Sequence, residues 1–196
     1  MIIRATKKVL TANKIKPQQI NEQQINNLNE WYVTLISSGY KGKYFLAYVH
    51  GKSLLTILTE GKSIKQTFNF FKHRLSALLL RSSFPKALIT QLTTATSTVE
   101  AISTTNSRSI LGYLNQIVGH ARARFDMTQT YQDIDLDVEE NILLDLLFSY
   151  NKKYFVPTSW WNNYIHGNDP YLPAQELSKD QKIIRPSELN KLGLTQ

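Results

Sequence analysis

The sequence predicts an α+β fold in which a single, mostly antiparallel sheet is covered by helices. Three aromatic and β-branched runs, "EWYVTLISS", "KYFLAYVH" and "SLLTILT", are separated by the short turns "GYKG" and "GK". Such spacing is typical of three antiparallel strands in a meander. Segments with helical periodicity stand before and after the meander, and the element order β-α-β-β-β-α-α-β-α-α favours the α+β class.

Two short segments outside the meander complete the predicted sheet. "MIIRA" is β-branched and predicts the N-terminal strand, and "STVEAISTT" alternates apolar and polar residues and predicts one later strand. A helix is expected over residues 6–15, with Thr6 as its N-cap. Residues 16–29 are rich in Gln and Asn, show no steady apolar period and predict a loop or a weak turn of helix.

Apolar residues at helical spacing predict four more helices. The first covers residues 63–83, where Ser63 can form the cap, and a shorter one restarts after Pro85. The third covers residues 106–125. The fourth covers residues 137–150 and has acids in its first turn, as the helix dipole prefers. The rest of the chain holds four of the six prolines, so we expect a helical or irregular C-terminal extension.

Charge is divided unevenly along the chain. Residues 1–125 carry 17 Lys and Arg against four acids, a net charge of +13, whereas residues 126–196 carry six against 11, a net charge of −5. We therefore predict a basic α+β domain, 1–125, and an acidic, Trp- and Pro-rich extension, 126–196. The extension is expected to dock on the basic domain through Trp160, Trp161 and the helix at 138–150. The division suits simple solubility, or a polyanion-binding surface that the acidic part partly covers.

Several kinds of site are excluded or disfavoured. The chain contains no cysteine, which excludes disulfides, thiolate metal sites and cysteine nucleophiles. Arg4, Lys7 and Lys8 argue against a signal peptide, and no apolar run is long enough to span a membrane, so we expect a cytoplasmic protein without membrane contact. No nucleotide-binding signature is present, and the four histidines lack the spacing of a zinc site. We expect no metal and no cofactor.

The third predicted helix has an unusual outward side. Arg108, Asn115 and Arg122 are seven residues apart and lie nearly on one line, with Gly112 and Gly119 between them. Glycine inside a helix costs about 1 kcal/mol relative to alanine, so two on one line indicate close approach by a neighbouring backbone. One interpretation is tight packing, with both arginines paired to carboxylates. The other is a flat basic track for a phosphate backbone or an anionic ligand.

Two stretches of the chain resemble an uncharacterised bacterial domain family. The pattern M-x-x-R-x-T-[KQ]-K-[VL]-L is matched by Arg4, Thr6, Lys8 and Leu10, and Trp31 opens the meander. The pattern N-[SD]-R-S-[IV]-L-G-x-[LM]-N is matched by Asn106, Arg108, Ser109, Leu111, Gly112 and Asn115. The resemblance covers about residues 1–125 and implies a small cytoplasmic bacterial domain with no established activity. It also suggests that Arg4 and Arg108 meet in space.

We expect a non-enzymatic module that binds nucleic acid or an acidic protein partner, because no acid–base pair or metal set can be named. The residues expected to bind a phosphate-rich ligand are Arg4, Lys8, Asn106, Arg108, Asn115 and Arg122. One alternative is a metal-independent, toxin-like nuclease that uses Arg4, Arg108, Tyr113 and His120 around a phosphate. Another is a purely structural domain that binds its own C-terminal segment or another copy of itself.

Overall fold

The described part of the chain belongs to two compact units. The structure, a computed structural model, describes residues 1–150 and 153–171. The first unit is Met1–Leu146 and the second is Leu147–Gln196. This division comes later than the predicted boundary after Phe125, because the acidic helix that follows belongs to the first unit. The part of the predicted extension at 172–196 lies outside the described residues.

Five strands of the first unit form one sheet in the order β4-β3-β2-β1-β5. They are β1 (Ile2–Ala5), β2 (Glu30–Ser37), β3 (Tyr44–His50), β4 (Thr56–Glu60) and β5 (Ala101–Thr104). The predicted meander is present, since β2, β3 and β4 pair antiparallel. β1 lies between β2 and β5 and pairs parallel with both. The α+β class is confirmed, but the sheet is mixed rather than mostly antiparallel.

The parallel pairings of β1 follow from its burial and its connections. All four residues of the strand are buried, so it suits the interior of a sheet better than an edge. Parallel neighbours need long crossover connections. Residues 6–29 provide the crossover from β1 to β2, and two helices separate β4 from β5.

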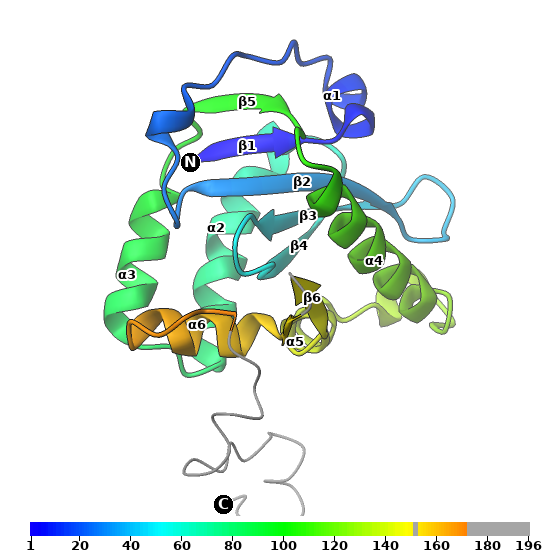
Figure 1. Cartoon of the computed structure of the whole chain (residues 1–196). Helices are drawn as coiled ribbons and strands as arrows, with labels where there is room; N and C mark the ends of the chain where they lie inside the picture. Colours follow the sequence, from blue (N-terminus) through cyan, green and yellow to red (C-terminus); the bar gives the residue numbers. More distant parts are fainter. Residues whose placement is uncertain (151–152, 172–196) are drawn as a thin grey trace, which may run out of the picture. The chain divides into compact units, whose positions relative to one another are not determined.

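Helices cover both faces of the sheet (Figure 1). In the first unit they are α1 (Lys7–Asn13), α2 (Ile64–Arg81), α3 (Lys86–Ala95), α4 (Arg108–Phe125) and α5 (Leu136–Leu144), with 3-10 turns at Glu22–Gln24 and Tyr131–Asp133. Phe71 of α2 packs against Trp31 and Tyr48, with ring centroids 5.0 and 4.5 Å apart. Phe125 of α4 packs at 5.0 Å against Phe45, whose side chain points to the opposite face. The sheet therefore lies between α2 and α4.

The helix starts differ in how their first N–H groups are satisfied. Ser107 caps α4, because its hydroxyl accepts a first-turn N–H at 3.3 Å. Thr6 and Ser63 stand at the predicted N-cap positions of α1 and α2, but neither makes a side-chain capping bond. Instead, Asn13 at the end of α1 accepts the N–H of Ile64 at 2.9 Å. This bond ties α1 to the start of α2.

The segment after α5 differs from the prediction. The helix expected over residues 137–150 ends at Leu144, and β6 (Phe148–Tyr150) pairs antiparallel with β7 (Lys153–Phe155). Helix α6 (Pro157–Ile165) follows, with proline in its first turn, where a missing N–H does no harm. Apolar residues continue from α5 into β6 without a glycine or proline, so the sequence carries no stop signal there.

The tryptophans expected to anchor the extension form an aromatic cluster in the second unit. Trp160 and Trp161 are buried, with ring centroids 4.8 Å apart, and Tyr164 stacks on Trp160 at 5.3 Å. The docking of this unit on the first stays a prediction. None of the helices in residues 1–150 and 153–171 is long and apolar enough to cross a membrane.

A buried carboxylate closes the β4 edge of the sheet. Glu140 of α5 is fully buried and accepts the backbone N–H of Leu58, in β4, at 2.9 Å. Its oxygens also accept bonds from Arg74 at 2.9 Å and Arg81 at 2.6 Å, both in α2. Burial raises the pKa of Glu140 above its ordinary value, whereas the arginines and the amide oppose that rise. One side chain thus joins β4, α2 and α5.

Replacing Glu140 by Ala is expected to lower the free energy of unfolding by about 3–5 kcal/mol, because two arginines and an edge amide lose their buried partner. Equilibrium urea unfolding measures the change. Glu60→Ala is the matched control, since Glu60 is exposed and its contact with Lys43 is long, at 3.9 Å. The control should lose less than about 1 kcal/mol. Equal losses in the two variants would contradict this role for Glu140.

His50 is a buried base at the end of β3, just before the turn to β4. Its Nδ1 lies 2.9 Å from the hydroxyl oxygen of Ser53 and accepts the Ser53 N–H at 3.2 Å. Burial lowers the pKa of His50 to about 3. Because the ordinary value is about 6.5, the unfolded chain binds this proton more readily than the folded one.

The stability that neutral His50 confers is expected to be complete above about pH 6.5 and to fall as the pH drops towards 3, by at most about 1.4 kcal/mol per pH unit. Urea unfolding between pH 7 and pH 4 measures this slope in the native chain and in His50→Asn, which keeps an acceptor but cannot titrate. His73→Asn, at an exposed position of α2, is the control. If His50→Asn keeps the native slope, the slope has another origin.

Candidate nucleic-acid interface

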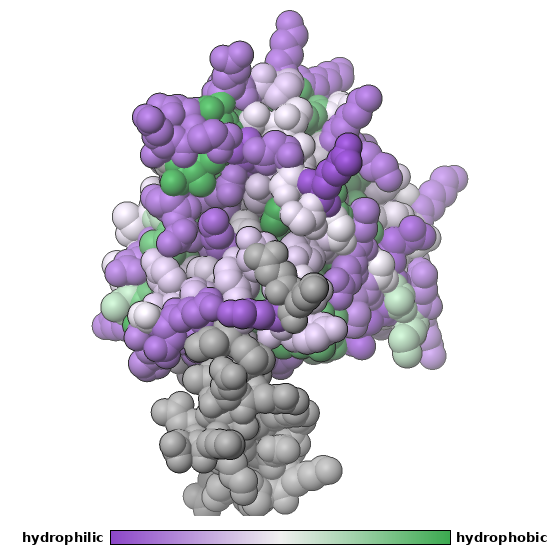
Figure 2. Space-filling view, in the orientation of Figure 1, coloured by the Kyte–Doolittle hydropathy of each residue, from purple (hydrophilic) through white to green (hydrophobic). Residues whose placement is uncertain are grey.

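The outward side of α4 is exposed along its whole length. The α4 line, as we name it, consists of the exposed residues Arg108, Gly112, Asn115, Gly119 and Arg122. The opposite side of the helix is buried through Leu114, Ile117, Ala121 and Phe125. α4 runs from the end of β5 to the β2–β3 turn, where the Tyr40 hydroxyl donates to the Thr128 carbonyl at 2.9 Å. Figure 2 shows the side of the molecule that carries α4, where hydrophilic residues dominate and apolar ones form small separate groups.

The two arginines of the α4 line are the ones without an ion pair in the described chain. Each of the other four described arginines, Arg4, Arg74, Arg81 and Arg124, forms a salt bridge with a carboxylate. Arg108 and Arg122 form none with a residue of 1–150 or 153–171. The interpretation that pairs both arginines inside the protein is therefore not supported, and their charges face solvent.

Arg4 does not belong to this exposed set, contrary to the prediction. Its side chain is 4% exposed, and it donates to Glu30 at 2.8 Å and to Glu22 at 2.7 Å. Burial by itself would lower the pKa of Arg4, but the hydrogen bonds and charges of the two carboxylates outweigh it and raise the pKa. Arg4 is therefore a structural cation, and a phosphate could reach it only by displacing these carboxylates.

The two motifs of the family resemblance come together at the level of the backbone. β1 and β5 are adjacent strands, and beyond them Thr105 donates its N–H to the Ala5 carbonyl at 3.2 Å. The side chains then diverge, because Arg4 turns to its carboxylates and Arg108 is exposed. The expectation that these two arginines meet holds for their segments and not for their guanidinium groups.

A larger positive surface lies where four strands end. Strands β1, β2, β4 and β5 run in the same direction (Figure 1). Their last residues and the β2–β3 turn therefore lie at the same end of the sheet, the end formed by the C-termini of these four strands. The basic edge, as we name it, consists of exposed cations that follow these strand ends: Lys7, Lys8, Lys41, Lys43, Lys62, Lys65 and Arg108. Because α4 begins there, the positive end of its dipole adds to the field.

Acids are scarce at the basic edge. Glu30 begins β2 and Glu100 precedes β5, so both lie at the opposite end of the sheet, where these strands begin. Near the basic edge, Glu60 contacts Lys43 at 3.9 Å, and Asp126 lies at the end of α4. The acids of α5 are engaged with arginines of α2 and α4 instead. The acidic segment therefore neutralises other cations and leaves this surface positive.

The glycines of the α4 line are open to solvent. A Cβ added at Gly112 or Gly119 would have no described atom within 4 Å, apart from atoms of the neighbouring residues and of the nearby helix backbone. The predicted close approach by another segment of the chain is therefore not made by any described residue. The glycines instead leave the middle of the α4 line flat between the two arginines.

The residues of the nuclease alternative do not converge. Arg108 and His120 are 12 residues apart in one straight helix, a rise of about 18 Å, and Tyr113 and His120 are about 10 Å apart. Arg4 is held by its two carboxylates. A single phosphate cannot contact groups that far apart, so the set does not form one catalytic centre. In residues 1–150 and 153–171, no cluster of His, Asp and Glu could hold a metal ion.

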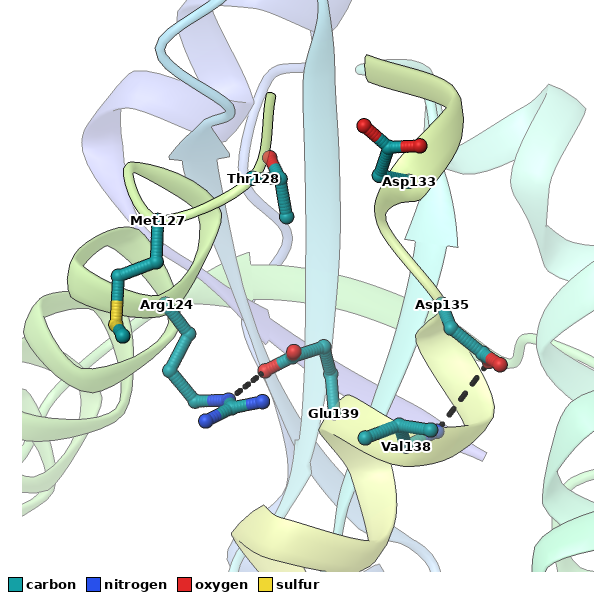
Figure 3. A pocket seen from close by; sticks show the side chains of 7 residues that line it. All are labelled: Arg124, Met127, Thr128, Asp133, Asp135, Val138 and Glu139. Atoms are coloured by element: carbon teal, nitrogen blue, oxygen red, sulfur yellow. Dashed lines mark hydrogen bonds and ion pairs between the residues drawn. The ribbon is translucent and has the colours of Figure 1, made fainter. Parts of the chain in front are cut away.

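A hollow of about 320 Å³ lies between the end of α4 and the start of α5 (Figure 3). Its acids already have structural partners. Asp135 accepts two N–H groups at the start of α5, Asp133 accepts the N–H and hydroxyl of Thr130, and Glu139 pairs with Arg124 at 2.7 Å. The hollow is explained by these capping and ion-pair contacts, and we assign no ligand to it.

The sequence analysis named some of the exposed residues of this surface and left others out. Lys8, Asn106, Arg108, Asn115 and Arg122 are all exposed, at or beside the basic edge and along α4. The lysines that it missed are Lys7, Lys41, Lys43, Lys62 and Lys65. A signal was present, because Lys7, Lys41, Lys62 and Lys65 follow the ends of predicted strands and Lys43 begins one. Only the pairing directions bring those strand ends together.

Comparison with known proteins identifies a domain family without a known activity. A family model described as "Domain of unknown function (DUF6933)" matches residues 2–160. Among curated proteins there is no significant match, and the same holds for solved structures. The matched range extends past residue 125, where the sequence resemblance ends, and includes α5 with Glu140. The predicted membership of an uncharacterised domain family is confirmed.

Replacing Gly112 or Gly119 by Ala is expected to raise the free energy of unfolding by up to about 1 kcal/mol, because both sites are helical and open. Gly39→Ala is the contrast. Gly39 has a φ of +85°, and an added Cβ would lie 2.9 Å from an oxygen of Asp126, so this change should destabilise. Urea unfolding measures all three variants. Destabilisation by alanine at 112 or 119 would show that something covers the α4 line in solution.

Proposed function

The chain belongs to the DUF6933 family, a domain family of unknown function, and from that premise we propose that it binds the phosphate backbone of a nucleic acid without cleaving it. The binding surface is the α4 line together with the basic edge. The observation that carries the proposal is the pairing of arginines: four of the six in the first unit have carboxylate partners, and the two without one stand in line on the outside of α4.

The length of the α4 line favours a polymer over a small anion. Arg108 and Arg122 are 14 residues apart, a rise of about 21 Å along the helix. No single phosphate reaches both. Phosphates of one strand of B-form DNA follow each other at about 3.4 Å along the axis, so the line spans several of them. Arginine suits this role, because its planar fork donates two bonds to a phosphate.

The glycines and asparagines fit a backbone ligand. Gly112 and Gly119 leave open space between the arginines, into which a phosphate or sugar can approach. Asn115, at the centre of the line, and Asn106, just before the helix, offer both donors and acceptors to such groups. These contacts position a strand and do not read bases, so sequence preference should be slight.

An acidic protein partner is the second candidate, because the same cations would attract it. The open, nearly unhindered line and the absence of exposed apolar anchors within it favour phosphate. Protein interfaces usually contain a buried aromatic or aliphatic anchor, whereas the α4 line consists of Arg, Gly and Asn.

The proposal is tested by salt titration with a labelled single-stranded oligonucleotide. With about three to five phosphate contacts, the plot of log K against log salt should have a slope of about −2 to −4. Arg108→Ala with Arg122→Ala should flatten that slope by about 1.4, since two contacts are lost. The matched control is Lys52→Ala with Lys86→Ala, which removes the same charge from exposed positions outside the α4 line and the basic edge. Its slope should stay within error of the native one.

The same titration separates the alternatives. Gel analysis of the oligonucleotide after incubation should show no cleavage. Cleavage that the double arginine variant abolishes would support the nuclease instead. No binding by the native chain at about 50 mM salt would refute the proposal and leave an acidic protein as the partner of this surface.

A further inference from the structure

Tyr44 is an aromatic side chain among the cations of the basic edge. It begins β3, which runs opposite to its neighbours, so it lies at the same end of the sheet as the last residues of β2 and β4. The side chain is half-buried. Within residues 1–150 and 153–171 its ring stacks on no other ring and its hydroxyl forms no hydrogen bond. The contact of the ring is with Lys62, whose Nζ lies 5.9 Å from the ring centroid.

Two further tyrosines near this end of the sheet already have structural partners. Tyr40 donates its hydroxyl to the Thr128 carbonyl at 2.9 Å, and its ring packs edge-on against Tyr131 at 6.0 Å. Tyr131 also stacks on Phe45 at 5.7 Å. These rings join the β2–β3 turn to the segment after α4. A planar ligand would have to break this contact there, whereas at Tyr44 it would meet a single lysine.

The contact between Tyr44 and Lys62 is weak enough to be exchanged. A cation–π contact needs the cation within about 6 Å of the ring centroid, so 5.9 Å is at the outer limit. Lys62 is exposed and is free to move away from the ring. A nucleobase stacked on Tyr44 would replace Lys62 and release its ammonium group to a neighbouring phosphate. Proteins that bind single strands combine an aromatic platform with cations in this way.

Tyr44 points to the face of the sheet that α2 covers. It lies four residues before Tyr48 in the same strand, so the two side chains point the same way. Tyr48 packs against Phe71 of α2 at 4.5 Å. The start of α2 adds the exposed cations Lys62 and Lys65 beside Tyr44.

The acids near the basic edge stand on the other face. Glu60 is the register partner of Phe45, whose ring packs against α4, and Glu60 contacts Lys43 at 3.9 Å. Asp126 follows the last residue of α4. Phosphates that flank a base on Tyr44 would therefore meet lysines rather than these carboxylates.

We propose that the nucleic acid bound at this surface is single-stranded and that one of its bases stacks on Tyr44. The inference rests on the function proposed above and names the kind of ligand. In a duplex the faces of the bases are covered, whereas an unpaired base can lie on an aromatic ring. β3 and β5 are three strand positions apart, about 14 Å, so a short stretch of the ligand joins Tyr44 to Arg108 at the start of α4. Stacking accepts any base, which agrees with slight sequence preference.

The test compares a labelled single strand with the duplex of the same sequence, by fluorescence anisotropy on the full chain at about 50 mM salt. The native chain should bind the single strand at least about fivefold more tightly than the duplex. Tyr44→Leu should weaken single-strand binding at least about fivefold, whereas Tyr44→Phe keeps the ring and should bind like the native chain. Tyr154→Leu, at a position 60% exposed in β7, is the control and should also bind normally.

Salt dependence separates stacking from phosphate contacts. Tyr44→Leu removes no cation, so the slope of log K against log salt should stay at its native value, whereas the double arginine variant flattens it. A strand of the same length without bases should bind Tyr44→Leu and the native chain equally. If Tyr44→Leu lowers the melting temperature, the native chain decides, because it should bind the baseless strand at least about fivefold more weakly than the ordinary one.

The outcomes distinguish this inference from the proposed function. Equal affinity for duplex and single strand overturns the inference and leaves nucleic-acid binding intact. So does native affinity in a Tyr44→Leu chain with an unchanged melting temperature, or equal affinity of the native chain for strands with and without bases. No binding to either ligand refutes the proposed function and this inference together.

Discussion

The carboxylate of Glu140 holds α5 against the edge strand β4 and against α2 in the first unit. An edge strand presents unpaired N–H groups, and proteins need to block such an edge against pairing with other chains. Here Glu140 of α5 accepts a hydrogen bond from the Leu58 N–H and, at the same time, hydrogen bonds from two arginines of α2. A buried charge is tolerated only with partners of this quality. The contact therefore fixes α5 on the sheet and on α2 together.

The same contact arranges charge over the whole unit. Glu140 and Asp137 neutralise Arg74 and Arg81, and Glu139 neutralises Arg124. Arg4 is satisfied by Glu22 and Glu30 on the opposite side of the meander. Many of the cations that remain exposed stand at the strand ends and on the outer side of α4, and others, such as Lys52 and Lys86, are exposed elsewhere. The acidic segment does not cancel the positive charge evenly, and it leaves the basic edge and the α4 line positive.

The outward sides of α2 and α4 differ in chemistry. α2 and α4 lie on opposite faces of the sheet, and both carry an outward line with the same alternating spacing. The line on α4 ends in unpaired arginines and has glycines inside it, which favours an extended anion. The line on α2 has exposed Phe70 and Leu80, and Lys65 and Lys72 stand in the adjacent row of the same helix.

The sequence by itself determined the local structure: the meander, the helices and the exposed line of α4 follow from periodicity, turn residues and capping residues, which act over a few residues. It did not determine which strands pair. β1 lies between β2 and β5 and pairs parallel with both. This placement depends on the burial of β1 and on long crossover connections, which involve residues far apart in the sequence, so a local sequence pattern does not reveal it. That placement also determines the environment of Arg4. The sequence predicts an exposed cation that binds a ligand, whereas in the structure Arg4 forms ion pairs with Glu22 and Glu30. The placement of β1 also assembled the basic edge, since lysines from three separate connections and Arg108 after β5 become neighbours only when their strands run the same way. The end of α5 also depends on a non-local contact. Phe148–Tyr150 pairs with a second strand instead of continuing the helix, and the uninterrupted run of apolar residues does not predict that pairing.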